Sequence, residues 1–211
     1  MGSPSNDTNR APTAPHPTPK PEPPAQPANT EATPASHQAK FRDAFRDHPA
    51  GVAIITATVD DEPVGVTVSS LASLSLEPLA VSFSLMKSTG SAGKLLRADS
   101  LLIHLLTAGQ ADVAASFAGS GVPKFAPEQG WETASRGEPL LPSARTIFRA
   151  RIAGRLPSGD ATLVAANIVD VYDHPEEVTT STDSVQGIHS REPLVFKGHK
   201  FYSLADTKPL A

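Results

Sequence analysis

Residues 51–68 constrain the fold most, because they contain two β-branched runs separated by one short polar turn. The first run is GVAIITATV at residues 51–59, the turn is DDEP at 60–63, and VGVTVS then resumes the strand pattern. Two runs joined by a few turn residues are typical of a β-hairpin. The folded part of the chain is therefore expected to begin with a pair of antiparallel strands.

Similar runs follow along the chain, and turns rather than regular helical crossovers join most of them. The further strand candidates are LAVSFSL at 79–85, SLLIHLL at 100–106, TIFRARIAGRL at 146–156, ATLVAANIVDVYD at 161–173, and PLVF and FYSL around Gly198. Helical spacing is confined to short segments near 41–48, 91–98 and 109–120, and residues 121–142 are expected to be mainly loop. The pattern predicts a mainly β fold of six to eight strands, an antiparallel barrel with short peripheral helices.

Alternation within residues 146–156 separates two kinds of side chain. Phe148, Ala150 and Ile152 share one face, and Arg149, Arg151 and Arg155 are predicted to share the other. We expect the arginine face to meet solvent or a partner.

The first forty residues differ from the rest in composition. They contain ten prolines and no Val, Ile, Leu, Phe, Trp or Tyr, so they have too little apolar surface to offset the entropy lost on folding. We interpret residues 1–40 as a disordered, proline-rich tail that lacks the apolar segment of a signal peptide. Residues 41–211 then form one domain of ordinary size, and the cytoplasm is the default compartment.

Composition and missing motifs exclude several classes of function. The chain has no cysteine, which excludes disulfides, zinc–thiolate sites and thiol catalysis. Its net charge of −4 gives no general reason to bind nucleic acid or an anionic membrane. The G-x-S-x-G, H-E-x-x-H, Walker and G-x-G-x-x-G motifs are all absent, which points away from side-chain or metal chemistry and toward a bound cofactor.

Two polar segments are candidates for holding such a cofactor. In VTVSSLASLSLEP, residues 66–78, the hydroxyl residues Thr67, Ser69, Ser73 and Ser75 alternate with apolar ones, apart from a break at 70–71. A row of short hydroxyls suits a neutral, polar, planar ligand, although a solvated sheet face is the alternative. In KSTGS, residues 87–91, one lysine and three hydroxyls stand where a helix begins, which suits a phosphate or a simple helix cap.

The order of these motifs resembles the flavin reductase-like family, which includes the reductase components of two-component flavin monooxygenases. The resemblance covers about residues 41–204, through GVAIITA, PVGVTVSSLASLSLEPLAVSF, MKSTGS, LLIHLL, PKF, SGD and PLVFKGHKFY. It implies a split β-barrel homodimer that binds FMN or FAD near the dimer interface. The residues that match the family's flavin-binding motifs are Thr67, Ser69, Ser70, Leu71, Lys87, Thr89, Ser91, Lys124 and Phe125.

The resemblance also implies a reaction, the transfer of hydride from NADH or NADPH to the flavin, which then serves a separate monooxygenase. No catalytic side chain and no metal are expected, since the cofactor supplies the chemistry.

Two positions depart from the family pattern. Ala161 replaces the histidine of the usual Gly-Asp-His turn, and His104 stands where the family tends to have asparagine. The first departure leaves open a flavin-binding protein that does not use NAD(P)H efficiently, and a non-catalytic interaction protein that uses the tail is a third alternative. His104 lies between Leu102 and Leu106 on its own strand face, where a core histidine is expected rather than a flavin contact.

Overall fold

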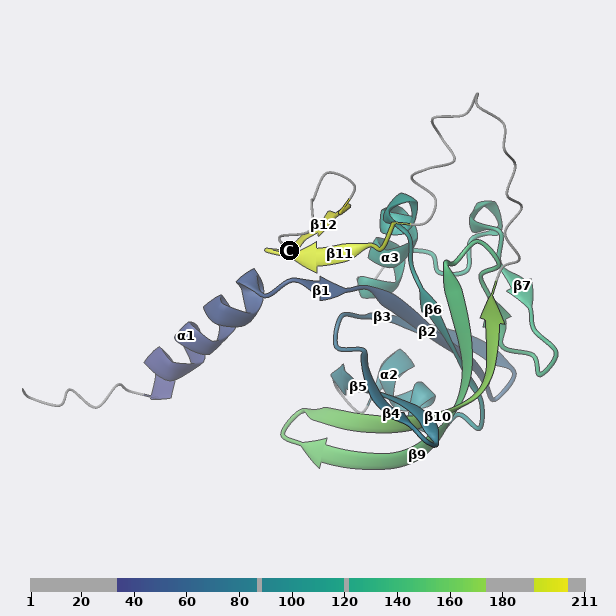
Figure 1. Cartoon of the computed structure of the whole chain (residues 1–211), viewed down its shortest axis with the longest axis horizontal. Helices are drawn as coiled ribbons and strands as arrows, with labels where there is room; N and C mark the ends of the chain where they lie inside the picture. The colour runs from purple at the N-terminus through teal and green to yellow at the C-terminus, as the bar shows by residue number, and fades with distance from the viewer. Residues whose placement is uncertain (1–33, 87–88, 120–121, 174–191, 205–211) are drawn as a thin grey trace, which may run out of the picture.

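An antiparallel sheet of seven strands forms the centre of the molecule (Figure 1). The structure is a computed structural model and describes residues 34–86, 89–119, 122–173 and 192–204. The strand order is β3-β2-β6-β9-β10-β5-β4. The strands are β2 (Ala53–Val59), β3 (Glu62–Val68), β4 (Ala72–Leu76), β5 (Leu79–Met86), β6 (Leu101–Leu105), β9 (Thr146–Ser158) and β10 (Ala161–Asp173). The mainly β, antiparallel prediction is confirmed, and the two end strands, β3 and β4, do not pair with each other.

The predicted hairpin is formed by β2 and β3. Val59 and Glu62 are cross-strand partners, so the turn contains only Asp60 and Asp61. Both have positive φ, 55° and 61°, as in the two-residue turns that match the twist of a hairpin. Aspartate tolerates this backbone better than most residues, and the turn is therefore two residues shorter than the predicted DDEP turn.

Short helices and minor strands surround the sheet. The helical elements are α1 (Pro34–Asp47), α2 (Gly90–Leu95), η1 (Ala108–Gln110), α3 (Ala111–Ala118) and η2 (Pro127–Gln129). The minor strands are β1 (Ala50–Gly51), β7 (Glu132–Thr133), β8 (Pro139–Leu140), β11 (Val195–Lys197) and β12 (Lys200–Tyr202). The predicted helices near 41–48, 91–98 and 109–120 correspond to α1, α2 and α3.

Helix α1 extends away from the sheet (Figure 1) and corrects the predicted boundary of the tail. It begins at Pro34, so residues 34–40 are helical, whereas residues 1–33 lie outside the described residues. Proline is favoured in the first turn of a helix, and the following Ala, Gln and Lys residues are good helix formers. The absence of large apolar side chains in this segment indicated little burial and did not exclude a helix.

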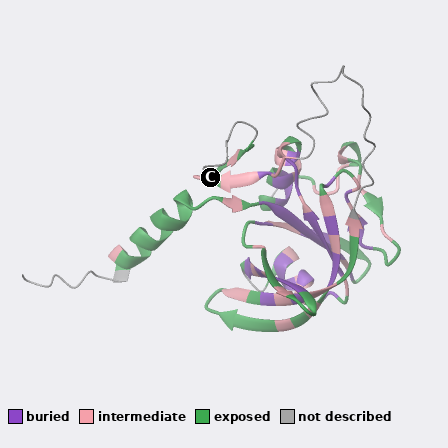
Figure 2. Ribbon diagram, viewed as in Figure 1, coloured by how far each residue is buried: buried purple, intermediate pink, exposed green. Residues whose placement is uncertain are grey.

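Two apolar clusters lie on opposite faces of β2 and β6, and Figure 2 colours much of the central sheet as buried. One contains Ile55, Ile103 and Phe83, and the other contains Ile54 and Leu102. Both faces of these central strands are therefore covered, which explains why their sequences read as continuous apolar runs rather than as strict alternation.

Arg149 on β9 is buried, so the prediction that it faces solvent or a partner is wrong. Only 7% of it is exposed, and its Nε lies 3.2 Å from Oε1 of the buried Glu138. The segment that leads into β8 covers this part of β9 and supplies the carboxylate that a buried guanidinium requires. Arg151 and Arg155 are exposed as predicted.

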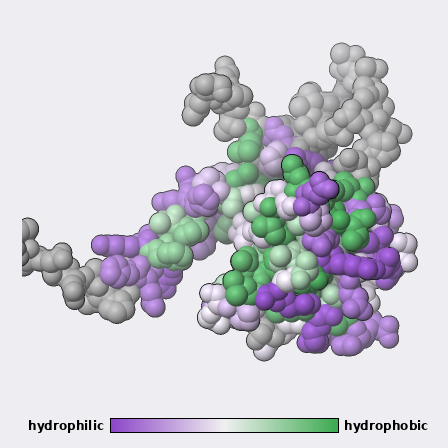
Figure 3. All heavy atoms as spheres, turned by 60° about the horizontal axis from the view of Figure 1, so that its bottom comes forward, coloured by the Kyte–Doolittle hydropathy of each residue, from purple (hydrophilic) through white to green (hydrophobic). Residues whose placement is uncertain are grey.

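The apolar side chains of β4 are exposed, although the alternation of residues 66–76 predicted one apolar face along a single strand. Leu74 and Leu76 are 54% and 83% exposed, and on neighbouring strands Leu79, Leu156 and Leu163 are also exposed. Figure 3 shows apolar side chains among polar ones on the underside of Figure 1, where β4, β5, β9 and β10 lie. In the strand pairing, Leu156 and Leu163 lie opposite each other on the sheet face that carries Ser84, whereas Leu76 and Leu79 lie opposite each other on the face that carries Phe83.

Candidate functional site

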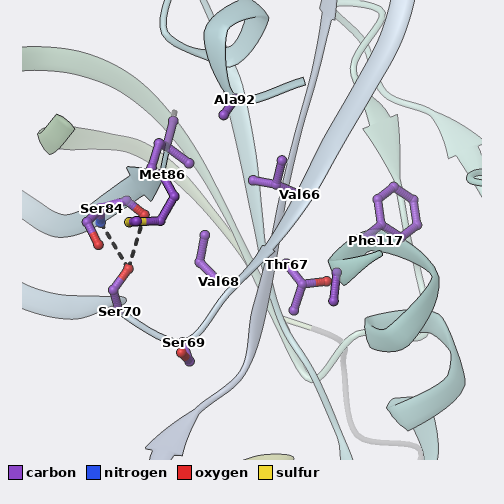
Figure 4. Close-up of a pocket in the computed structure, with 11 residues that line it drawn as sticks. Val66, Thr67, Val68, Ser69, Ser70, Ser84, Met86, Ala92 and Phe117 are labelled. Atoms are coloured by element: carbon purple, nitrogen blue, oxygen red, sulfur yellow. Dashed lines mark hydrogen bonds between the residues drawn. The ribbon is translucent and has the colours of Figure 1, made fainter. Parts of the chain in front are cut away.

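The candidate site begins where the polar strand breaks. Strand β3 ends at Val68 and β4 starts at Ala72, so residues 69–71 form a bend. The Ser70 hydroxyl accepts a hydrogen bond from the Ser84 amide at 2.9 Å and lies 3.3 Å from the Ser84 carbonyl oxygen (Figure 4). This serine therefore ties the bend to β5 instead of presenting its hydroxyl freely to a ligand.

A pocket of about 330 Å³ lies beside this bend (Figure 4). Thr67, Ser69, Ser70 and Ser84 supply its hydroxyls, and its apolar lining comes from Val66, Val68, Leu85, Met86, Ala92, Phe117 and Ala118. The volume falls at the lower end of the range for small-molecule sites. An apolar lining with a few hydroxyls at one edge suits a flat ring system that carries polar atoms on its rim.

The predicted row of hydroxyls has divided roles. Thr67 Oγ1 donates a 2.6 Å hydrogen bond to the Ala114 carbonyl and thereby attaches α3 to β3. The exposed Ser69 hydroxyl has no hydrogen-bond partner among the described residues, so it is available to a ligand. Ser73 and Ser75 lie on β4 and do not line the pocket.

Gly65 on β3 allows two aromatic rings to approach the strand closely. A Cβ added at this residue would lie 2.7 Å from Cε1 of Phe117 and 3.3 Å from Cζ of Phe125. The two rings meet edge to face, with their centroids 4.8 Å apart. Trp131 packs against both rings, at 5.3 Å from Phe117 and 5.1 Å from Phe125. Phe117 borders the pocket, so the other two aromatic rings support its wall from behind.

Lys124 and Phe125 lie beyond this wall and do not line the pocket. Lys124 Nζ donates to the Gly65 carbonyl at 3.2 Å and lies 5.7 Å from the centre of the Phe117 ring. Partial burial lowers the pKa of the Lys124 ammonium, which a nearby anion would counteract. Phe125 has a positive φ of 56°, which is uncommon for a bulky residue.

The predicted phosphate motif is described only in part. Lys87 lies outside the described residues. Thr89 is the exposed N-cap residue of α2 and makes no side-chain capping bond, while Ser91 is half-buried in the first turn. Ala92, the next residue, lines the pocket, so the start of α2 lies at the pocket edge. Leu71 packs against the core and does not line the pocket.

His104 is a core histidine, as predicted, and is fully buried. Its Nδ1 lies 3.1 Å from the Ile54 carbonyl, and its Nε2 accepts the Leu141 amide at 3.2 Å. Nδ1 must therefore carry the proton of the neutral ring. Burial lowers the pKa of His104 to about 4, against a partly opposing effect of the Ile54 carbonyl.

Sequence reasoning missed Ser84, Met86 and Phe117 as pocket residues. The alternation of serine with apolar residues in LAVSFSL could have identified Ser84, because it repeats the pattern of the preceding polar segment. Ala161, the position of the missing family histidine, pairs directly with Met86 across β10 and β5. The departure from the family pattern is thus beside the pocket.

The part of the chain that the structure describes has neither a cluster of metal ligands nor a membrane-spanning helix. There, no three His, Asp or Glu side chains lie close enough together to hold a metal ion. Within the same residues, none of the helices has both the length and the apolar composition that a bilayer crossing requires.

Comparisons with known proteins agree with this geometry. Residues 45–205 match the family model described as flavin reductase like domain. The chain is 37% identical over 162 residues to an NADH:FMN oxidoreductase of Rhodococcus qingshengii, covering 77% of this chain and 79% of the relative.

Two further relatives extend the comparison. The reductase subunit HsaB of a flavin-dependent monooxygenase of Mycobacterium tuberculosis is 29% identical over 135 residues, covering 64% of this chain and 72% of that protein. The structure of the Streptomyces globisporus NADH:FAD oxidoreductase SgcE6, in complex with NAD and FAD fragments, matches with a TM-score of 0.69. It is 25% identical and covers 85% of this chain and 99% of that one.

Proposed function

Because this chain belongs to the flavin reductase like domain family, we propose that it is an NAD(P)H-dependent flavin reductase that supplies reduced FMN or FAD to a partner monooxygenase. The observation that carries the proposal is the pocket beside the 69–71 bend, with its apolar lining and its hydroxyls at one edge. A bound flavin would supply the hydride-accepting chemistry, and its ring has the flat shape and polar rim that this lining fits.

The residues of the chain are proposed to bind and position the flavin and the hydride donor, and none of them reacts chemically. Val66 and Phe117 exclude water from one side of the pocket, and the unpartnered Ser69 hydroxyl offers a hydrogen bond to the polar rim of the ring. Lys87, Thr89 and Ser91 are proposed to hold the flavin phosphate, since the start of α2 borders the pocket. Positioning of the two reactants is the main catalytic contribution expected from such a site.

We further propose that the protein is a homodimer with the split-barrel arrangement of its family. Two exposed cross-strand leucine pairs support this, Leu156 with Leu163 and Leu76 with Leu79, since a second copy can cover exposed apolar side chains of this kind. A mass measurement by light scattering at micromolar concentration tests this, and a monomer would contradict it. The cytoplasmic location stays a prediction.

A second candidate, a flavin-binding protein that uses NAD(P)H inefficiently, is favoured by one observation. Ala161 occupies the position of the family histidine and faces Met86 at the pocket edge. If the histidine places the nicotinamide, its loss slows reduction without affecting flavin binding, because misplacing a hydride donor by ~1 Å can cost on the order of a hundredfold.

The deciding experiment is anaerobic reduction of bound flavin by NADH and by NADPH in the wild type and in Ala161→His. The matched control is Ala165→His, which introduces the same side chain four residues along β10, opposite Ser82 instead of the pocket residue Met86. Fast reduction by the wild type, with no gain in Ala161→His, supports the reductase. Slow reduction that only Ala161→His accelerates supports the second candidate.

A further inference from the structure

A second pocket, of about 320 Å³, lies beside the turn of the β2–β3 hairpin and shares no lining residue with the pocket at the 69–71 bend. Its lining includes Asp61, Pro63, Phe125, Trp131, Glu132 and Pro139. Thr58 also lines it, but the Thr58 hydroxyl is occupied, because it donates a 2.6 Å hydrogen bond to the Gly137 carbonyl. No lysine, arginine or histidine is among the described residues that line this pocket, so its charged groups are two carboxylates.

Asp61 differs from its two acidic neighbours in the hairpin turn. Asp60 lies 3.8 Å from Arg97, and Glu62 forms an ion pair with Lys94. Among the described residues, neither Asp61 nor Glu132 has a side-chain ion pair or hydrogen-bond partner. Two carboxylates that lack a cation therefore line one pocket and make its potential negative.

The aromatic part of the lining forms a corner. The ring centroids of Phe125 and Trp131 are 5.1 Å apart, and the ring planes are inclined at 74°. Trp131 Nε1 donates a 2.8 Å hydrogen bond to Gln129 Oε1, which helps to hold the indole in this orientation. The face of an aromatic ring attracts a cation through its quadrupole. The rings and the carboxylates consequently favour the same kind of ligand.

We propose that this pocket binds a small organic cation, a guanidinium group on a short alkyl chain. A guanidinium is planar, stacks on aromatic rings and presents paired N–H groups to a carboxylate, whereas an ammonium is compact and more strongly hydrated. The alkyl chain has apolar surface to contact at Pro63 and Pro139. The volume lies at the lower end of the range for small-molecule sites, which limits the ligand to a small one.

Trp131 is the only tryptophan of the chain, so its emission reports on this pocket. The full-length protein without flavin is titrated with butylguanidinium at constant ionic strength while this emission is recorded. The matched probe is butylurea, which has a similar planar head and the same alkyl chain but no charge. We expect a saturable change with butylguanidinium, a dissociation constant on the order of 1 mM, and about tenfold weaker binding of butylurea. An unchanged emission, or equal binding of the two probes, would overturn the proposal.

Two carboxamide variants test whether the negative charges hold the cation. Asp61→Asn and Glu132→Gln keep the shape of each side chain, and asparagine tolerates the positive φ of 61° at the first position. Each variant is expected to weaken butylguanidinium about threefold, and the double variant about tenfold, with butylurea unchanged. Glu128→Gln is the matched control, since Glu128 is exposed but does not line the pocket. Equal weakening in the control would indicate general attraction to an acidic surface and refute the site.

The aromatic corner is tested by saturation-transfer NMR, which observes the probe and needs no tryptophan. Trp131→Leu removes the aromatic ring, and we expect it to weaken butylguanidinium about fivefold. Trp131→Phe keeps a smaller ring and is expected to weaken it about twofold, which preserves the test if the leucine variant unfolds. Full affinity in a folded Trp131→Leu protein would contradict binding of the cation at this corner.

Discussion

The buried His104 predicts a specific dependence of stability on pH. In the unfolded chain its imidazole binds a proton below about pH 6.5, whereas in the folded protein burial lowers the pKa to about 4. Between these values the unfolded state binds more protons, so the free energy of unfolding falls as the pH falls. With these two pKa values, His104 alone removes ~2 kcal/mol of stability between pH 7 and pH 5, and ~3 kcal/mol by pH 4.

The assay is equilibrium unfolding in urea at pH 7, 6 and 5, in the wild type and in His104→Asn. Other groups titrate in this range, so the informative quantity is the difference in pH dependence between the two proteins. Asparagine cannot take up a proton, but its amide can replace one of the hydrogen bonds to Ile54 or Leu141. The variant is expected to be less stable at pH 7 and to lose ~2 kcal/mol less than the wild type on acidification to pH 5.

The result that would refute this reasoning is an equal loss of stability in both proteins. It would mean that the folded state protonates His104 as readily as the unfolded chain does, and that the imidazole is not held neutral by its two backbone partners. A second variant, His104→Leu, keeps the prediction testable if His104→Asn unfolds, because leucine also removes the titration.

Three further predictions concern the site and the tail. Gly65→Ala should destabilise the protein by roughly 1–3 kcal/mol in urea unfolding and weaken FMN binding, because the new Cβ displaces the Phe117 ring; unchanged values would show that the rings move without cost. Lys87→Ala should weaken FMN binding by roughly 1–3 kcal/mol in fluorescence titration but barely affect riboflavin, which has no phosphate; equal losses would indicate a structural role. Deletion of residues 1–40 should leave the FMN dissociation constant unchanged, and loss of binding would place part of the site in the tail or α1.

The sequence predicted the central strands well because their patterns reflect local burial. Residues 53–59 and 101–105 are covered on both faces, and their apolar runs identified them. The turn after Val59 was located by its polar residues, although it is two residues shorter than predicted. These features depend on neighbouring residues or on one strand at a time, and such information is present in the sequence.

The remaining errors arose where a distant segment decides the environment. Arg149 is buried because Glu138 and the chain before β8 cover it, and nothing in the strand alternation could indicate this. Thr67 was identified as a site residue, but its hydroxyl is bonded to Ala114, 47 residues away. The Ser69 hydroxyl is available to a ligand, as predicted. The sequence showed the break in alternation at 70–71, but it did not show that Ser70 is hydrogen-bonded to Ser84.

The sequence did not predict the packing of Phe117, Phe125 and Trp131 against Gly65. Phe125 was identified through the family resemblance, but Phe117 and Trp131 belong to separate segments with no shared motif. They come together because Gly65 lets Phe117 and Phe125 approach β3, and Trp131 packs on both. The absence of a side chain at Gly65 thus permits this packing of aromatic rings, which hydrophobic periodicity in the sequence does not predict.

Helix α1 has a consequence for the timescales on which the chain opens. It is joined to the rest through a backbone hydrogen bond from Gly198 to the Arg46 carbonyl, and its Phe41 and Phe45 rings contact each other rather than the core. A 14-residue helix with so little packing is only marginally stable in water. The backbone amides of α1 therefore exchange with deuterium through local fraying, whereas exchange of the β2 and β6 amides requires global unfolding. Among the helices and strands that the structure describes, a protease that needs an unfolded segment as substrate consequently cuts at α1 before it cuts the central sheet.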